Sequence, residues 1–242
     1  MFRALSLMVA LAGCRACDEA KPKRDAASQC LAARPAQSGE ATHYVADGTG
    51  SCSFEKPSAN GDAKVSDATK MVAAINGTDY ANAAWCGACV EVTGPSGSVV
   101  VRVVDKCPGC AKGDLDLSRE AFEHIAPLSA GRVPISWREV ACEVTGPISY
   151  QFKDGSSQHW TGIQIRNHRY PIATLEARDT SGAYAAITRL DYNYFVDTDG
   201  LGPGPYTLRV TDTRGQTIED VNIAVGDNVA RTGAAQFPTC TN

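Results

Sequence analysis

Aromatic residues are scarce in this sequence, whereas turn-forming residues are plentiful. Phe, Trp and Tyr make up 7% of the 242 residues, against 22 glycines and 12 prolines. Glycine and proline are costly inside helices, so this composition argues against a helical bundle and favours turn-rich β structure. The length allows one large domain or two ordinary ones, each able to bury its own core.

An excess of positive charge is also missing, since the formal net charge is −4 at pH 7. Proteins that bind nucleic acids need a cationic face, because affinity comes largely from releasing the counterions of phosphates. We therefore expect no nucleic-acid partner.

The apolar run at the N-terminus, MFRALSLMVALAGC, is too short to span a bilayer. One basic residue precedes it and small residues end it, which is the pattern of an export signal. Residues 11–14 resemble a bacterial lipobox, so we expect residues 1–13 to be a signal peptide cut before a lipidated Cys14. An ordinary secretory signal cut slightly later is the alternative. Residues 14–38 mix charge, Ala, Ser and Pro without periodicity and predict a flexible tether.

Ten cysteines in an exported chain predict disulfide bonds, which persist in oxidising compartments. If Cys14 is lipidated, an odd number remains, and the sequence does not assign Cys17, Cys30 or Cys240. It also does not choose among the possible pairings of the other candidates, which are Cys52, Cys86, Cys89, Cys107, Cys110 and Cys142.

Residues 85–110, WCGACVEVTGPSGSVVVRVVDKCPGC, contain two Cys-x-x-Cys pairs that suit a zinc ribbon or a thioredoxin-like site on paper. A zinc ribbon would leave Cys52 and Cys142 without a role. A redox site needs its first cysteine at a helix N-terminus, where the thiolate is stabilised. Residues 90–93 instead alternate as a strand does. We therefore favour structural disulfides and expect neither a resident metal nor a cofactor.

Local patterns outline the rest of the chain. Residues 65–77 predict a short helix that ends at Asn-Gly, and residues 98–104 predict a buried strand. Ser118 is a suitable N-cap for a helix that follows it, and residues 134–140 predict a strand. Beyond a linker at residues 145–147, short strand patterns recur between turns, which predicts a β-sandwich.

Several stretches, taken in order, resemble the expansins, in particular the bacterial expansin-like proteins and their fungal relatives. They are VVDKCPGC (103–110), GDLDLS (113–118), FKDGSS (152–157), IQIRNHRYP (163–171) and DYNYF (191–195). The resemblance covers roughly residues 39–240. It implies a six-stranded double-psi β-barrel with short helices over residues 39–145, then an immunoglobulin-like carbohydrate-binding β-sandwich over residues 146–240. It also implies that the cysteines of the barrel form disulfides.

Asp116 matches the acid that protonates the glycosidic oxygen in the related family-45 endoglucanases. Asp116 could instead cap the following helix, but Ser118 already supplies that cap. Hydrolysis with inversion also needs a second carboxylate across the glycan. The endoglucanases place this base two residues after the equivalent of Tyr44, whereas Asp47 lies three residues after it, and a one-residue slip in a strand turns a side chain to the other face. We therefore expect binding and loosening of glycans rather than cleavage.

The resemblance implies further glycan contacts. Thr42 and Tyr44 match the edge of the family's groove, and Asp105 matches a second acid, although a turn-starting Asp is the alternative. Some bacterial members have a groove aromatic where this chain has Cys107. In the sandwich, positions that match a platform for cellulose are occupied by Lys153, His159, Trp160 and Tyr192. Tyr192 and Tyr194 lie two apart and would share one face of a strand.

The sequence therefore predicts a secreted monomer, attached to the bacterial cell envelope only through a lipid anchor. Its expected partner is a polysaccharide, either cellulose, a xylan-type matrix glycan or peptidoglycan. Two alternatives stay open: a glycan-cleaving endoglucanase or lytic transglycosylase that uses Asp116 as its acid, and a non-catalytic carbohydrate-binding or adhesion lipoprotein.

Overall fold

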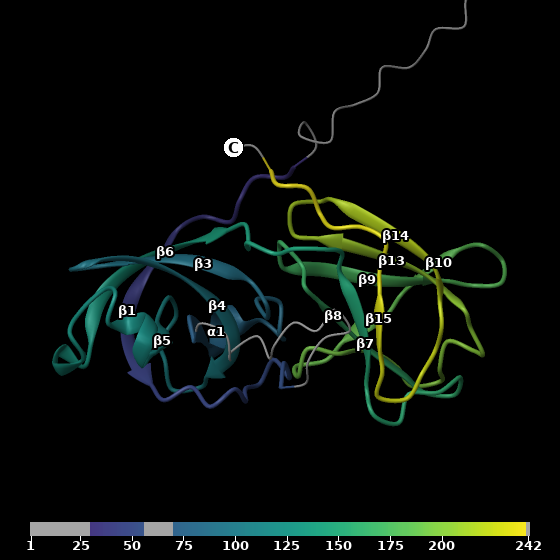
Figure 1. Cartoon of the computed structure of the whole chain (residues 1–242), viewed down its shortest axis with the longest axis horizontal. Helices are drawn as coiled ribbons and strands as arrows, with labels where there is room; N and C mark the ends of the chain where they lie inside the picture. The colour runs from purple at the N-terminus through teal and green to yellow at the C-terminus, as the bar shows by residue number, and fades with distance from the viewer. Residues whose placement is uncertain (1–29, 56–69, 241–242) are drawn as a thin grey trace, which may run out of the picture.

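The computed structural model describes residues 30–55 and 70–240, which form two β units side by side (Figure 1). The expected signal peptide, the lipidation site at Cys14, and Cys17 lie outside the described residues. Among the described residues, no helix is long and apolar enough to cross a membrane.

The first unit is a closed six-stranded barrel with the strand order β1-β5-β2-β4-β3-β6. Pairs β1–β5 and β2–β4 are parallel, and the other neighbouring pairs are antiparallel. The strands are β1 (Gln37–Tyr44), β2 (Val72–Asn76), β3 (Cys89–Gly94), β4 (Gly97–Cys107), β5 (Leu115–Ser118) and β6 (Val133–Val140). The short helices α1 (Gly77–Tyr80), α2 (Arg119–Phe122) and η2 (Leu128–Ala130) complete it. The unit has the expected double-psi barrel fold.

Alternation of apolar and polar residues explains how these strands close around a core. Along β6, Val133, Ile135 and Trp137 are buried while the residues between them are exposed. Ser118 ends β5 and caps α2, since its hydroxyl accepts a hydrogen bond from the backbone N–H of Ala121 at 3.3 Å. The N-cap that the sequence predicts is therefore confirmed.

The helix expected at residues 65–77 is wrong over its described part. Val72–Asn76 forms β2, and all five residues are buried. A central strand buried on both faces presents a continuous apolar run, which periodicity alone does not distinguish from a buried helix. Asn76 ends the strand and accepts a hydrogen bond from the N–H of Asp79, so the Asn-Gly pair begins helix α1 instead of ending one.

The second unit is a sandwich of a four-stranded sheet, β10-β9-β13-β14, and a five-stranded sheet, β11-β12-β8-β7-β15. Its core includes Tyr150, Phe152, Leu175 and Leu208. The strands are β7 (Ser149–Phe152), β8 (Thr161–Arg166), β9 (Ile172–Arg178), β10 (Tyr184–Ala186), β11 (Thr188–Arg189), β12 (Phe195–Asp197), β13 (Tyr206–Asp212), β14 (Thr217–Ile223) and β15 (Ala230–Thr232).

The residues just before the barrel are attached to the folded body. Cys30 forms a disulfide with Cys240, across 210 positions of sequence. The backbone N–H of Leu31 donates to the carbonyl of Arg214 at 2.7 Å, and the guanidinium of Arg34 lies 4.1 Å from the centre of the Trp85 ring. Residues 30–38 are therefore not part of the flexible tether expected at residues 14–38. The sequence pattern did not show this, because the disulfide partner Cys240 lies 210 positions away.

The two Cys-x-x-Cys pairs contribute to three separate disulfides. These bonds are Cys52–Cys86, Cys89–Cys142 and Cys107–Cys110. Cysteines joined in this way cannot act together as zinc ligands, so the structure excludes the zinc ribbon at these positions. The residues that follow Cys86 form turns and then β3, as the strand pattern predicts.

Candidate polysaccharide-binding site

The register of the barrel places the candidate groove residues in one row. Across neighbouring strands, Thr42 in β1 pairs with Asp116 in β5, Asp116 pairs with Ala74 in β2, and Ala74 pairs with Asp105 in β4. Directly paired residues present their side chains to the same face of a sheet. The two acids are therefore two strand spacings apart, about 10 Å between Cα atoms, with only a methyl group between them.

Thr42 holds the carboxylate of Asp116 directly. Its hydroxyl donates a hydrogen bond to Asp116 Oδ1 at 2.6 Å. Asp116 is half-buried, while its neighbours Leu115 and Leu117 are buried in the barrel. The strand alternation therefore anchors β5 in the core and directs the carboxylate of Asp116 to the outer face of the barrel.

Tyr44 lies on the same face of β1 as Thr42, two residues further along. Its hydroxyl is buried and has no hydrogen-bond partner among the described residues. Burial raises the pKa of Tyr44, and the negative charges of Asp105, Asp116 and Asp47 raise it further. This phenol therefore stays neutral, with a proton to donate, among three acids.

Asp105 is held by two backbone N–H groups. Its Oδ1 accepts hydrogen bonds from the N–H of Ser51 at 2.6 Å and of Lys106 at 2.7 Å. Two residues later, Cys107 ends β4 and is joined to Cys110. A disulfide thus occupies the position of the groove aromatic that some bacterial members have.

Asp47 lies beyond the end of β1 in an exposed loop. Its Oδ1 accepts hydrogen bonds from both the N–H and the hydroxyl of Thr49, at 3.0 and 2.7 Å. These contacts are typical of an Asx turn and give Asp47 a local structural role.

The candidate platform residues lie outside the named strands of the sandwich. Trp160 is half-buried and immediately precedes β8, and a Cβ atom added to Gly162 would come within 2.9 Å of its indole ring. The absence of a side chain at Gly162 therefore allows the indole to lie against the strand. His159 is exposed beside it.

Tyr192 is half-buried, whereas Tyr194 is only 6% exposed. Their ring centres lie 5.9 Å apart, and the ammonium of Lys153 lies 5.7 and 5.4 Å from the two ring centres. Residues 191–194 form a turn, and β12 begins only at Phe195. The strand alternation expected for residues 192–195 therefore does not apply, and Asn193, Tyr194 and Phe195 are all buried.

Three supporting residues carry no obvious functional signal in the sequence. Gly162 makes room for Trp160, Ser51 holds Asp105, and Asp114 fixes the loop before β5. The two carboxylate oxygens of Asp114 accept hydrogen bonds from the N–H groups of Glu40 and Ala111, at 2.8 and 3.1 Å. Only the identity of their tertiary partners shows what these residues do.

Comparison with known proteins agrees with this architecture. A protein-family model described as lytic transglycolase matches residues 37–137. The crystal structure of the apo expansin from Clavibacter michiganensis is similar, with a TM-score of 0.75 and 32% sequence identity, over 86% of this chain and all of that chain. This chain belongs to the expansin family.

Other expansins extend the comparison. A mutant of the Clavibacter michiganensis expansin, solved in complex with cellohexaose, matches with a TM-score of 0.76 and 31% identity. Expansin-YoaJ of Bacillus subtilis is 40% identical over 153 residues, which are 62% of this chain and 65% of that protein. Expansin-like protein 2 of Dictyostelium discoideum is 28% identical over 89% of this chain and 50% of its own length. The chain thus spans between half and just under two thirds of the length of these two curated relatives.

Proposed function

We propose that this expansin binds β-linked glucan chains and loosens the non-covalent contacts between them without hydrolysing them. The observation that carries the proposal is the row of Thr42, Asp116 and Asp105 across neighbouring strands of the barrel. The related expansin solved with cellohexaose supports a cellulose-type ligand. Lys153, His159, Trp160 and Tyr192 are proposed as the second contact area.

Loosening follows from competition for hydroxyl groups. Asp116 Oδ1 already accepts a hydrogen bond from Thr42, and its second oxygen can accept one from a sugar hydroxyl. Hydrogen bonds to a charged group contribute about 1.5–3 kcal/mol, more than the neutral bonds between glucan chains. A chain held by Asp116 and Asp105 therefore exchanges contacts with its neighbours for contacts with these carboxylates.

The position of Asp47 argues against hydrolysis. Inversion requires a carboxylate that activates water on the far side of the sugar. Asp47 instead accepts two hydrogen bonds from Thr49 within its own loop. Asp116 acts in this proposal as a hydrogen-bond acceptor and not as a proton donor.

The test combines an extension assay on inactivated cell-wall strips with a reducing-sugar assay on the same samples. We expect the wild type to increase extension without releasing reducing ends, and Asp116→Asn to lose most of the extension. Glu123→Gln, which neutralises an exposed carboxylate of the barrel, is the matched control and should behave as wild type. If the wild type releases reducing ends and Asp116→Asn does not, the protein is an enzyme that uses Asp116. Extension unaffected by Asp116→Asn, with binding abolished by Trp160→Ala, would show a passive binding module.

Glycan choice and location extend the proposal. We expect retention on cellulose and xylan, and the same pulldown on chitin and peptidoglycan tests the wider range. The protein acts outside the cell, anchored through Cys14 as a monomer. Detergent phase partitioning of the wild type and Cys14→Ser tests the anchor, because only a lipidated protein should enter the detergent phase.

A further inference from the structure

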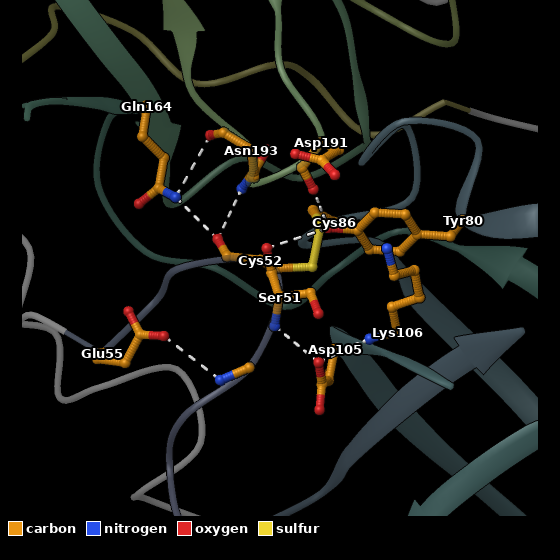
Figure 2. The surroundings of a disulfide bond; sticks show 11 residues. Ser51, Cys52, Glu55, Tyr80, Cys86, Asp105, Lys106, Gln164, Asp191 and Asn193 are labelled. Atoms are coloured by element: carbon orange, nitrogen blue, oxygen red, sulfur yellow. Dashed lines mark hydrogen bonds between the residues drawn. A yellow bond between two sulfur atoms is a disulfide. The ribbon is translucent and has the colours of Figure 1, made fainter. Parts of the chain in front are cut away.

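Three of the four disulfides in the described part of the chain join distant segments. One of them, Cys52–Cys86, is buried at both cysteines, and Cys86 Sγ lies 3.5 Å from the hydroxyl of Tyr80 (Figure 2). The carbonyl of Cys52 also accepts hydrogen bonds from the side-chain amides of Gln164 and Asn193 in the sandwich, at 2.9 and 3.2 Å. The other two join residues 53 and 210 positions apart, and they are Cys89–Cys142 and Cys30–Cys240. Long closed loops restrict the unfolded chain most, so these three bonds are suited to stabilising the fold.

The fourth bond, Cys107–Cys110, differs in span and in exposure. Its cysteines are only three positions apart, and both are partly exposed. Pro108 and Gly109, which lie between them, are exposed. A Cβ atom added to Gly109 would come within 4 Å of no heavy atom beyond its chain neighbours. Molecules in solution can therefore approach this turn.

The short span also limits what this bond contributes to the stability of the barrel, because a small closed loop removes little freedom from the unfolded chain. The chain directly after the turn is held by Asp114, whose carboxylate accepts hydrogen bonds from the N–H groups of Ala111 and Glu40. These contacts and the three other disulfides do not depend on Cys107–Cys110. Opening this bond should therefore change the barrel only locally.

That local region belongs to the proposed groove. Strand β4 carries Asp105 and ends at Cys107, and β5, which carries Asp116, follows the turn. Asp105 Oδ1 accepts a hydrogen bond from the N–H of Lys106 at 2.7 Å, and Lys106 directly precedes Cys107 (Figure 2). The disulfide therefore restricts the strand end that holds one acid of the groove and the turn that leads to the other.

We propose that Cys107–Cys110 is a site of reversible modification by low-molecular-weight thiols, and that opening it weakens the glycan contact of Asp105. The second part rests on the proposed function. In an oxidising compartment the bond is closed, and it opens only where a thiol is supplied. A closed bond keeps the strand end ordered before glycan binds, whereas an open one leaves part of that ordering to be done on binding.

The reaction is thiol–disulfide exchange. A thiolate forms a bond to Cys110 Sγ while the bond from Cys110 to Cys107 breaks, and Cys107 leaves as a thiolate that takes up the proton released by the attacking thiol. A second thiol displaces the first from Cys110. The two small thiols are thereby oxidised to their disulfide, and the two cysteines are reduced to thiols. Because the attacking thiolate comes from solution, the protein does not need a helix N-terminus that activates a cysteine of its own.

The first test measures which bond opens. Folded, oxidised protein is incubated with increasing concentrations of reduced glutathione, free thiols are blocked with iodoacetamide, and peptides are analysed by mass spectrometry. We expect glutathione or the blocking group on Cys107 and Cys110 at a thiol concentration about tenfold lower than at the cysteines of the two buried bonds, since exchange depends on access to the sulfur atoms.

The second test measures retention on cellulose at a thiol concentration that opens only Cys107–Cys110. We expect retention of the wild type to fall by about threefold and to recover on reoxidation. The variant Cys107→Ser/Cys110→Ser should show the lowered retention with and without thiol. Cys30→Ser/Cys240→Ser, which removes a different disulfide, is the matched control and should respond to thiol as the wild type does. If the first variant does not fold, the reduced and reoxidised forms of the wild type carry the test.

Two results would overturn the inference while the proposed function stands. One is a Cys107–Cys110 bond that opens only together with the buried bonds. The other is retention on cellulose that stays unchanged when this bond is open. An oxidised wild type that is not retained on cellulose would instead overturn the proposed function and the glycan part of this inference, and the peptide analysis would still decide whether the bond reacts with thiols.

Discussion

The proposed groove and the proposed platform are built by different means. In the groove, strand register sets the positions of Thr42, Asp116 and Asp105, which lie in one row of paired strands. In the platform, Trp160 pairs with Ser157 in an isolated β-bridge and Tyr192 lies on a turn, so no continuous strand ladder sets their positions. Specific neighbours support these aromatic rings instead: the bare backbone of Gly162 and the ammonium of Lys153.

This difference matches the chemistry expected of each area. Hydrogen bonds to sugar hydroxyls depend steeply on distance and angle, so the acids need a rigid frame. Stacking of a ring on a flat sugar surface tolerates small displacements. In the barrel, replacing a functional residue should therefore cost less stability than replacing a structural neighbour. In the platform, the functional aromatic residues should be the ones that are partly exposed.

The largest expected effect on glycan loosening separates two acids of the same strand region. Asp114→Ala leaves the N–H groups of Glu40 and Ala111 without their acceptors, so we expect the free energy of unfolding to fall by about 2–4 kcal/mol. Asp116→Ala removes only the contact with Thr42 and should cost less than about 1 kcal/mol, but it should abolish glycan loosening. Urea denaturation and the extension assay measure both. Similar stability losses in the two variants would contradict the distinction.

The platform offers a similar contrast between two tyrosines. Tyr194→Ala empties a buried position and should cost about 3–5 kcal/mol, as large aromatic truncations do. Tyr192→Ala should cost little stability but weaken retention on insoluble cellulose by roughly tenfold, in common with Trp160→Ala. Depletion assays on cellulose, with thermal melts of the same samples, test this. Unchanged retention in both single variants would remove the platform from the site.

The frame of the sandwich should show opposing pH effects. Burial raises the pKa of Asp212 to about 6, and burial lowers the pKa of His168 to about 3. A raised pKa of a carboxyl group means that the fold gains stability as pH falls below 6, and a lowered pKa of a histidine means that it loses stability as pH falls below 6.5. Between pH 6 and 4 the two effects oppose each other, each by up to about 1.4 kcal/mol per pH unit.

Asp212→Asn should remove the stability that Asp212 contributes as pH falls, and it should keep the stability loss caused by His168. We expect its free energy of unfolding, measured in urea between pH 6 and 4, to fall more steeply than that of the wild type by about 1.4 kcal/mol per pH unit. Nearby groups that face Asp212 are Glu139, whose pKa is also raised by burial, and Arg214. Both remain in the variant, and because the charge of Glu139 contributes to the raised pKa of Asp212, the difference includes the loss of this coupling. Parallel stability curves would contradict the assignment.

The smallest expected effect concerns salt. The net charge is −4, and ring stacking is not screened by ions, so retention on cellulose should change by less than about twofold between low and high ionic strength. A steep loss of retention in high salt would show that Lys153 and other cations dominate over the rings.

Local patterns are sufficient where the physical cause is local. Apolar and polar residues alternate over residues 90–93, and β-branched residues dominate residues 98–104. Both patterns are typical of strands, and these residues form parts of β3 and β4. The hydroxyl of Ser118 caps the helix that follows it. The expansin motifs lie on both sides of the linker and identify the family, in agreement with the similarity to the Clavibacter michiganensis expansin over 86% of this chain.

Contacts between distant segments needed the tertiary structure. The run at residues 72–76 becomes a strand because β4 and β5 pair with it on both sides. Half-burial of Tyr192 beside a buried Tyr194 depends on a turn that Lys153 covers from another loop. Attachment of residues 30–38 depends on Cys240, at the other end of the described chain.

By itself, the sequence determined the family, the β architecture of two units, the helix cap and the use of cysteines as disulfides, since each depends on residue types and their order. The tertiary structure alone decided which cysteines pair, which acids share a row and which residues join the two units. Those properties depend on contacts between residues far apart in the sequence. Bringing such residues together has an entropic cost, and the contacts that offset it involve distant residues that no local pattern identifies.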